Sequence, residues 1–199
     1  CRAMGAVDLS TRNDANALSL LFKNDRGQYF HRPTFYASEK AVRGNLKYQA
    51  YKNSGELIAT LGNKTDQSRI EDDILEFSER FEVLKWGFDD FQGDYIMTRC
   101  MDQGLEVLNY GATVKNFSAP MKEVDVLTDD GELFNDGNSC MTWMMGNVVC
   151  FTDQKDNIFP RKQNKNDKKS KIDGPVSLIM AMGLWMAEEE EGEAGLFYV

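Results

Sequence analysis

The sequence of 199 residues contains one histidine, His31, and four cysteines that show no C-x-x-C or Cys/His ligand spacing. Because this histidine alternates with aromatic residues in an expected strand, a histidine-based catalytic triad is not supported, and the cysteine spacing supports no zinc site. The chain also lacks the G-x-x-x-x-G-K-[ST] motif of nucleotide-binding loops, and its nearest string is GNKT at 62–65. We therefore expect that this chain neither binds nor hydrolyses ATP.

Long hydrophobic runs are also missing. The longest apolar stretch, residues 175–187, is too short to span a bilayer, and no basic-then-apolar leader opens the chain. We expect no membrane association and a reducing compartment, in which Cys140 and Cys150 are small buried thiols. The first residue is Cys1 rather than methionine, which agrees with a piece of a longer protein.

The net charge of −9 argues against a protein that coats nucleic acid non-specifically, but the charge is unevenly distributed. Residues 161–171, here called the basic segment, carry six basic side chains and one acid. Residues 188–193, the acidic tail, carry five glutamates. Runs of this kind are usually solvated loops, and we expect both to be so.

The apolar patterning predicts one well-cored domain, residues 1–199, in which strands and helices alternate. Strands are expected at 3–10, 17–23, 28–36, 56–62, 82–91, 104–110 and 147–153, with 157–160 pairing with the last of these. Helices are expected at 38–53, 66–81, 93–103, 118–130, 138–145 and 174–187. Three early strands followed by strand–helix–strand units imply an α/β fold with a mixed sheet flanked by helices.

Three aspartates occupy unusual positions at the ends of apolar elements. Asp8 lies within GAVDLS, Asp89 ends the strand VLKWGF, and Asp173 stands at the head of the last helix. The carboxyl ends of strands gather ligands at one edge of an α/β sheet, so these side chains can be neighbours. Converging carboxylates favour hard divalent cations such as magnesium or manganese, and two such ions can hydrolyse a phosphodiester.

Asp173 has an alternative interpretation. Ser170 and Asp173 fit an S-x-x-D capping box, and Pro175 suits the first turn of a helix. Taken alone, each of the three aspartates is more often a cap or turn residue than a metal ligand.

The decisive pattern is a series of motifs in a fixed order. They are GAVDLSTRNDANAL near the start, WGFDDF in the middle, FSAPMKEVDVL (117–127), DGNSCMTWMMGNVV (136–149) and KSKIDGPVSLIMAMG (169–183). On these motifs nearly the whole chain resembles the C-terminal nuclease domain of the terminase large subunit of tailed bacteriophages, which cuts concatemeric DNA during packaging.

The resemblance implies a ribonuclease-H-like fold in which Asp8, Asp89 and Asp173 bind two Mg²⁺ or Mn²⁺ ions and are catalytic. Asp90 stands where the family commonly has proline; Asp89 keeps the register. The implied partners are double-stranded viral DNA, the terminase ATPase domain, the small terminase subunit and the portal protein. The implied location is the host bacterial cytoplasm, and the family's N-terminal packaging ATPase is absent from this chain.

The basic segment precedes Asp173 directly, so we expect it to contact the DNA backbone, where phosphate neutralisation dominates affinity. The candidate residues are Arg161, Lys162, Lys165, Lys168, Lys169 and Lys171. Lys171 could instead be a solvated lysine. His31 is expected to be structural, and Met141, Trp143, Met144 and Met145 to be core. Asn138 and Asn147 belong to a matched motif without an assigned role.

Two other functions fit the same residues. One is another ribonuclease-H-like nuclease, such as a resolvase or transposase core. The other is a non-catalytic DNA-binding or motor-docking module whose acids only cap and solvate.

Overall fold

The computed structural model describes residues 2–10, 15–89, 94–163 and 170–196, and the side chains of these residues except those of 94 and 192–196. The strands are β1 (Arg2–Asp8), β2 (Asn16–Lys23), β3 (Tyr29–Ser38), β4 (Ile58–Thr60), β5 (Glu82–Phe88), β6 (Val107–Asn109), β7 (Leu133–Asn135), β8 (Val148–Thr152) and β9 (Ile158–Lys162). The helices are α1 (Glu39–Arg43), α2 (Leu46–Asn53), α3 (Gln67–Arg80), α4 (Asp94–Asp102), α5 (Val114–Asp129), α6 (Ser139–Met145) and α7 (Asp173–Leu196).

The main sheet is mixed, as the sequence predicts. Its strand order is β4-β3-β2-β1-β5-β6, and β7 pairs with β3. β1, β2 and β3 form an antiparallel meander, whereas β5 is parallel to β1, β6 to β5, and β4 and β7 to β3. Every strand of this sheet except β2 therefore points the same way, and their carboxyl ends lie at one edge, here called the carboxyl edge.

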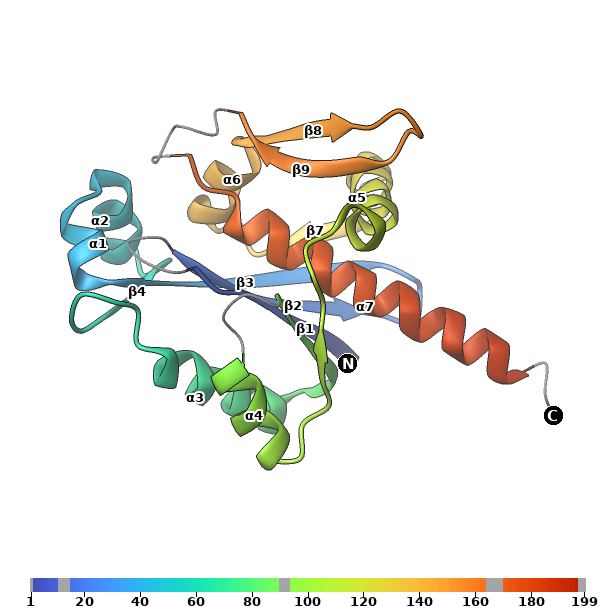
Figure 1. Cartoon of the computed structure of the whole chain (residues 1–199), viewed down its shortest axis with the longest axis horizontal. Coiled ribbons are helices and arrows are strands. Elements are labelled where there is room, and N and C mark those ends of the chain that lie inside the picture. The colour runs from blue at the N-terminus through green and yellow to red at the C-terminus, as the bar shows by residue number, and fades with distance from the viewer. Residues whose placement is uncertain (1, 11–14, 90–93, 164–169, 197–199) are drawn as a thin grey trace.

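Helices cover both faces of the sheet (Figure 1). α3 and α4 lie on one face, while α5, α6, α7 and the separate β8–β9 hairpin lie on the other. Each face has its own hydrophobic cluster, because successive side chains of a strand point to opposite sides. In β1, Met4 and Ala6 pack with α7, and Val7 packs with α3 and α4. We call the first of these the α7 face.

Several local features follow from the chemistry of single residues. The β2–β3 hairpin turns at NDRG, where the Asn24 side chain accepts hydrogen bonds from two backbone amides and Gly27 has a φ of +83°. Pro33 lies in β3 between the residues that pair with β7 and those that pair with β4, so its position is locally an edge. The helix expected at 38–53 is two helices, because Asn45 caps a new one by accepting from Lys47 N.

Four expectations are wrong or incomplete. The acidic tail is not a loop: α7 continues to Leu196 rather than ending at 187. Glu188 and Glu191 pair with Lys85, and Glu189 pairs with Lys23, which anchors this part of the helix to β5 and β2.

Cys140 is buried as predicted, but Cys150 is exposed on the hairpin. β7 was not predicted, and Met145 is 40% exposed rather than core. Among the described residues, none of the helices combines the length and the hydrophobicity of a membrane span.

Candidate metal centre at the carboxyl edge

Two of the three predicted aspartates are adjacent in the sheet. β1 and β5 run parallel, with Val7 opposite Phe88. Asp8 and Asp89 are the residues that follow this pair, one after each partner. Neighbouring strands lie about 4.8 Å apart, so these half-buried side chains leave the carboxyl edge side by side. Asp89 Oδ1 also accepts a long hydrogen bond of 3.4 Å from Ala112 N, in the segment that follows β6.

Both aspartates follow the periodicity of the α7 face. Asp8 is two residues beyond Ala6, which packs with α7. Asp89 is two residues beyond Gly87, where an added Cβ would lie 3.1 Å from Leu184 of α7. Because the side-chain period of a strand is two, both carboxylates belong to the side of the sheet that α7 covers.

The third aspartate reaches the same edge from α7. Asp173 is the first residue of that helix and is 8% exposed. A Cβ built on the next residue, Gly174, would lie 2.7 Å from Met141 Sδ and 2.9 Å from the Phe35 ring. Phe35 pairs with Ala17, which pairs with Asp8, so the head of α7 rests on the row of the sheet that contains Asp8. Only glycine allows this close approach.

The capping box proposed for Ser170 and Asp173 does not form. The first α7 hydrogen bond runs from Val176 N to Ile172 O, so Ile172 rather than Ser170 occupies the capping position. Ser170 Oγ is buried and has no hydrogen-bond partner in the described part of the chain. The Ser170–Asp173 capping box is therefore not supported, whereas Pro175 does lie in the first turn of α7, as this alternative expected.

The segment that leads into α7 is held by α6 and the turn after it. Asn147 Nδ2 donates a 2.9 Å hydrogen bond to the carbonyl of Lys171, and Gly174 N lies 3.3 Å from Met144 Sδ. Asn138 caps α6, since its side chain accepts from Met141 N at 3.0 Å. Lys171 is only 4% exposed, so the solvated alternative for this lysine is wrong. The structure thus supplies roles for both asparagines of the DGNSCMTWMMGNVV motif.

Two acidic side chains act on the buried Cys140 thiol of α6. Burial raises the pKa of the Cys140 thiol, and the charges of Glu56 and Asp173 raise it further.

His31 is structural, as predicted: burial lowers the pKa of its imidazole to about 3, and its Nε2 lies 2.8 Å from Ser19 Oγ. Ser19 in turn bonds to Ser177 of α7 at 2.7 Å, which fixes the helix on the sheet.

The aspartates share an edge and a face, but they are not gathered into a closed ligand set. Among the described residues, no group of three or more His, Cys, Asp or Glu side chains is arranged to hold a metal ion. Asp90 lies outside the described residues, so the choice between Asp89 and Asp90 stays open. The three predicted ligands are carboxylates, whose oxygens magnesium and manganese prefer.

The basic segment is only partly described. Arg161 and Lys162 lie in β9, and the Arg161 guanidinium is 3.4 Å from the centroid of the Phe151 ring. Lys165, Lys168 and Lys169 lie outside the described residues. Because Arg161 and Lys162 are half-buried and Lys171 is buried, the expectation of a uniformly solvated loop is wrong for these residues.

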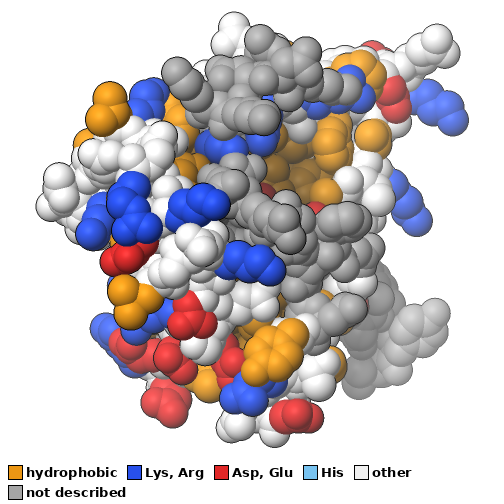
Figure 2. Space-filling model, turned by 60° about the vertical axis from the view of Figure 1, so that its left-hand side comes forward, with side chains coloured by type: hydrophobic (Ala, Val, Ile, Leu, Met, Phe, Trp, Pro, Cys, Tyr) orange, Lys and Arg blue, Asp and Glu red, His pale blue; other side chains and the backbone are white. Residues whose placement is uncertain are grey.

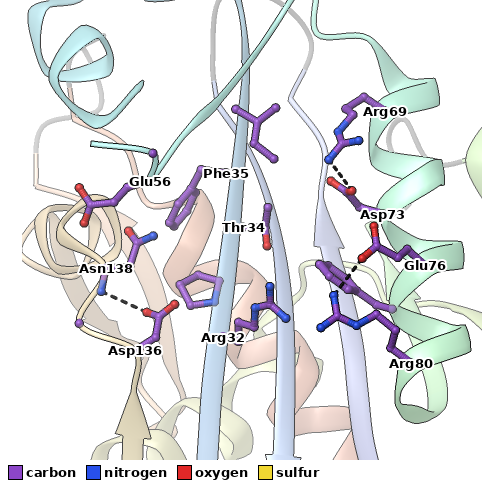
Figure 3. Close-up of a pocket in the computed structure, with 15 residues that line it drawn as sticks. Arg32, Thr34, Phe35, Glu56, Arg69, Asp73, Glu76, Arg80, Asp136 and Asn138 are labelled. Atoms are coloured by element: carbon purple, nitrogen blue, oxygen red, sulfur yellow. Dashed lines mark hydrogen bonds and ion pairs between the residues drawn. The ribbon is translucent and has the colours of Figure 1, made fainter. Parts of the chain in front are cut away.

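A separate pocket of about 440 Å³ lies beside the unpaired stretch of β3 (Figure 3). Its charged groups largely neutralise one another: Arg69 bonds Asp73 at 2.7 Å, and Arg80 bonds Glu76 at 2.9 Å. The pocket shares Phe35 with the seat of α7 but contains none of the three aspartates. It is therefore distinct from the candidate metal centre.

Comparison with known proteins decides the family. The family description "Terminase large subunit, endonuclease domain" matches residues 2–191. The chain belongs to the terminase large-subunit endonuclease family. The family resemblance that was inferred from the motifs is thereby confirmed.

Two curated relatives are similar to this terminase nuclease domain. Protein YmfN of Escherichia coli K12 is 29% identical over 94% of the chain and 44% of its own length. The terminase large subunit of Enterobacteria phage HK97 is 26% identical over 93% of the chain and 38% of its own length. The chain thus spans less than half of the relatives it matches.

Solved structures show the same fold. The HK97 large terminase superimposes with a TM-score of 0.81 at 24% identity, covering 92% of this chain and 39% of that one. The nuclease of phage G20c with bound magnesium gives 0.54 at 13% identity, with 90% and 79% coverage. The SPP1 nuclease domain with bound manganese gives 0.53 at 12% identity, with 94% and 88% coverage. The expected ribonuclease-H-like α/β fold is confirmed.

Proposed function

We propose that this terminase nuclease domain is a divalent-metal-dependent endodeoxyribonuclease that cuts concatemeric viral DNA during genome packaging. The observation that carries the proposal is that Asp8, Asp89 and the head of α7 lie at one edge and on one face of the sheet. The solved relatives with bound magnesium, cobalt and manganese support the use of divalent metal.

In this proposal Asp8, Asp89 and Asp173 hold two Mg²⁺ or Mn²⁺ ions. Bound there, such ions supply an activated water and stabilise the charge of the leaving oxygen of a phosphodiester. The role of the protein is positional. Strands β1 and β5 fix two carboxylates one strand spacing apart, and the packing of Gly174 against Phe35 fixes the third.

Lys171 and the basic segment complete the proposal on the substrate side. Lys171 lies two residues before Asp173, and its main chain is held by Asn147. Its side chain is 4% exposed, so a contact with DNA requires this side chain to become exposed when DNA binds. We assign it, with Arg161, Lys162, Lys165, Lys168 and Lys169, to contacts with the DNA backbone. The ATPase domain, small terminase subunit and portal protein as partners, and the host cytoplasm as the location, belong to the same proposal through the family.

The test is cleavage of plasmid DNA with magnesium or manganese. The wild-type chain should nick or cut with little sequence preference, and chelation should stop it. Asp8→Asn, Asp89→Asn and Asp173→Asn should each nearly abolish cutting, whereas Glu189→Gln, which removes a carboxylate at the far end of α7, should not. Loss in Asp90→Asn with retention in Asp89→Asn would move the second ligand to Asp90.

The resolvase or transposase alternative is separated by substrate, because a branched junction would then be cut in preference to a linear duplex. Full activity in all three asparagine variants would instead favour the non-catalytic module, with any cutting due to a contaminant.

A further inference from the structure

The α1–α2 pair lies beside the candidate metal centre. β3 points the same way as β1 and β5, so α1, which follows β3 directly and is capped by Ser38, starts at the carboxyl edge. The Tyr48 hydroxyl of α2 accepts a 3.3 Å hydrogen bond from Ala15 N, in the connection between β1 and β2 that follows Asp8. Chain direction and a direct contact thus place these helices next to the Asp8 end of the sheet.

The position of α2 is rigid. The Tyr48 and Tyr51 rings lie 6.2 and 5.9 Å from the ring of Trp143 in α6, and Lys47 Nζ lies 4.6 Å from the same ring. Tyr48 is almost completely buried. Because α6 also seats the head of α7, α2 and Asp173 are held by one helix. A surface on α1 and α2 therefore keeps a fixed relation to the proposed site.

That surface is basic although the chain is acidic overall. Residues 39–53 carry four basic side chains against one acidic side chain. The four are exposed: Lys40, Arg43, Lys47 and Lys52. Only Arg43 has an ion-pair partner among the described residues, Glu39 at 3.5 Å, and both side chains are open to solvent. Figure 2, which brings the α1–α2 end of the molecule forward, shows Lys and Arg side chains gathered on this face.

The spacing suits DNA. β1 and β3 are separated by β2, so the end of β3 lies about 10 Å from the end of β1, at about 4.8 Å per strand. Phosphates of one DNA strand advance by about 3.4 Å per step along the duplex axis. A strand with its scissile phosphate at the aspartates would therefore bring phosphates a few steps away over α1 and α2.

We propose that Lys40, Arg43, Lys47 and Lys52 form a second contact surface for the DNA backbone, beside the metal centre and separate from the basic segment. This inference rests on the proposed function, because it takes the phosphate backbone of the cleaved DNA as the occupant. The surface supplies the positive charge that a chain of net charge −9 needs to hold a polyanion.

The test compares two matched double variants of the 199-residue chain. Arg43→Gln/Lys52→Gln removes two charges from the surface, and both side chains are exposed, so each change should cost within about 0.5 kcal/mol of stability. Arg2→Gln/Arg26→Gln removes two exposed charges from the opposite edge, at the start of β1 and in the β2–β3 turn. The two variants have the same net charge, so a long-range effect of charge is common to both.

Binding of a fluorescent duplex is measured at several salt concentrations, with calcium in place of magnesium to block cutting. The log–log salt slope of Arg43→Gln/Lys52→Gln should be shallower by about 1.8, because each lost phosphate contact removes about 0.9. The Arg2→Gln/Arg26→Gln slope should remain at the wild-type value. Each single variant, Arg43→Gln or Lys52→Gln, should give about half the change, which secures the result if the double variant unfolds.

Equal slopes for the two double variants, in a wild-type chain that binds duplex, would overturn this inference and leave the proposed function standing. A wild-type chain that binds no duplex would overturn both. The two failures are therefore distinguishable.

Discussion

The two ends of α7 carry carboxylates in opposite environments. At its head, Asp173 is 8% exposed, and the next residue, Gly174, packs closely on Phe35 and Met141 at the carboxyl edge. At its far end, the Glu189 and Glu191 side chains are 45% and 71% exposed and pair with lysines. Figure 1 shows the helix passing along the sheet and projecting beyond it at the acidic end.

The difference teaches what burial does to a carboxylate. An exposed ion pair gains little, about 0–1 kcal/mol, because water and salt screen it. A buried carboxylate is costly unless positive charge or hydrogen bonds compensate it, and such groups are enriched at functional sites. With Asp8 and Asp89 at the same edge, the head of α7 is our candidate for metal binding, whereas the glutamates attach the helix to β2 and β5.

The largest structural effect is expected from filling the space at Gly174. In Gly174→Ala the new Cβ would overlap Met141 Sδ and the Phe35 ring, and overpacking of this kind costs about 1–3 kcal/mol. Thermal unfolding should report this loss, and the displaced Asp173 should weaken manganese binding. Gly146→Ala is the matched control, since an added Cβ there meets only backbone atoms at 3.6 Å or more. Unchanged stability and metal affinity in Gly174→Ala would show that α7 is not tightly seated.

A smaller effect is expected from Asn147. Asn147→Ala removes the hydrogen bond to the Lys171 carbonyl, which is worth about 1 kcal/mol in unfolding free energy. Its particular consequence should be weaker manganese binding, because the segment leading into Asp173 loses its tether. Asn138→Ala removes a helix cap of similar value, about 0.5–2 kcal/mol, at the start of α6, without touching the hydrogen bond to Lys171. If both variants lowered metal affinity equally, the tether would have no special role.

The smallest effect is expected at the acidic end. Lys85 donates to Glu188 and Glu191, and these contacts raise the pKa of its ammonium above the usual 10.5. A raised folded-state pKa stabilises the fold at neutral pH, and this contribution is lost as the pH rises above about 10.5 through the higher folded value. Glu188→Gln/Glu191→Gln should lower stability by about 0–1 kcal/mol at pH 7, less in high salt, and flatten the alkaline loss. A large, salt-independent loss would show that this end is part of the core.

The sequence predicted the parts of this fold that depend on local chemistry. The amphipathic helix α3 and the apolar strands β1 and β2 were predicted because periodicity and apolar runs act within a few residues. The helical state of 188–193 was not, because it depends on Lys23 and Lys85, more than 100 residues away in the chain.

For the candidate site, the sequence predicted which residues take part but not the contacts that position them. Asp8, Asp89 and Asp173 were selected by charge at the ends of apolar elements and by family motifs, without knowledge of their mutual distances. The role of Asn147 was missed, because a side chain that bonds a carbonyl 24 residues away leaves no local pattern. Asn138 had a signal, since an asparagine before a helical run is a favoured cap.

The central claim is that the buried head of α7, and not its acidic end, binds divalent metal. The direct test is titration of the folded chain with Mn²⁺, followed by calorimetry and electron paramagnetic resonance, for wild type, Asp173→Asn and Glu189→Gln. The account predicts two bound ions in wild type and Glu189→Gln, and at least a tenfold weaker affinity or the loss of an ion in Asp173→Asn. Wild-type binding by a folded Asp173→Asn chain would contradict it.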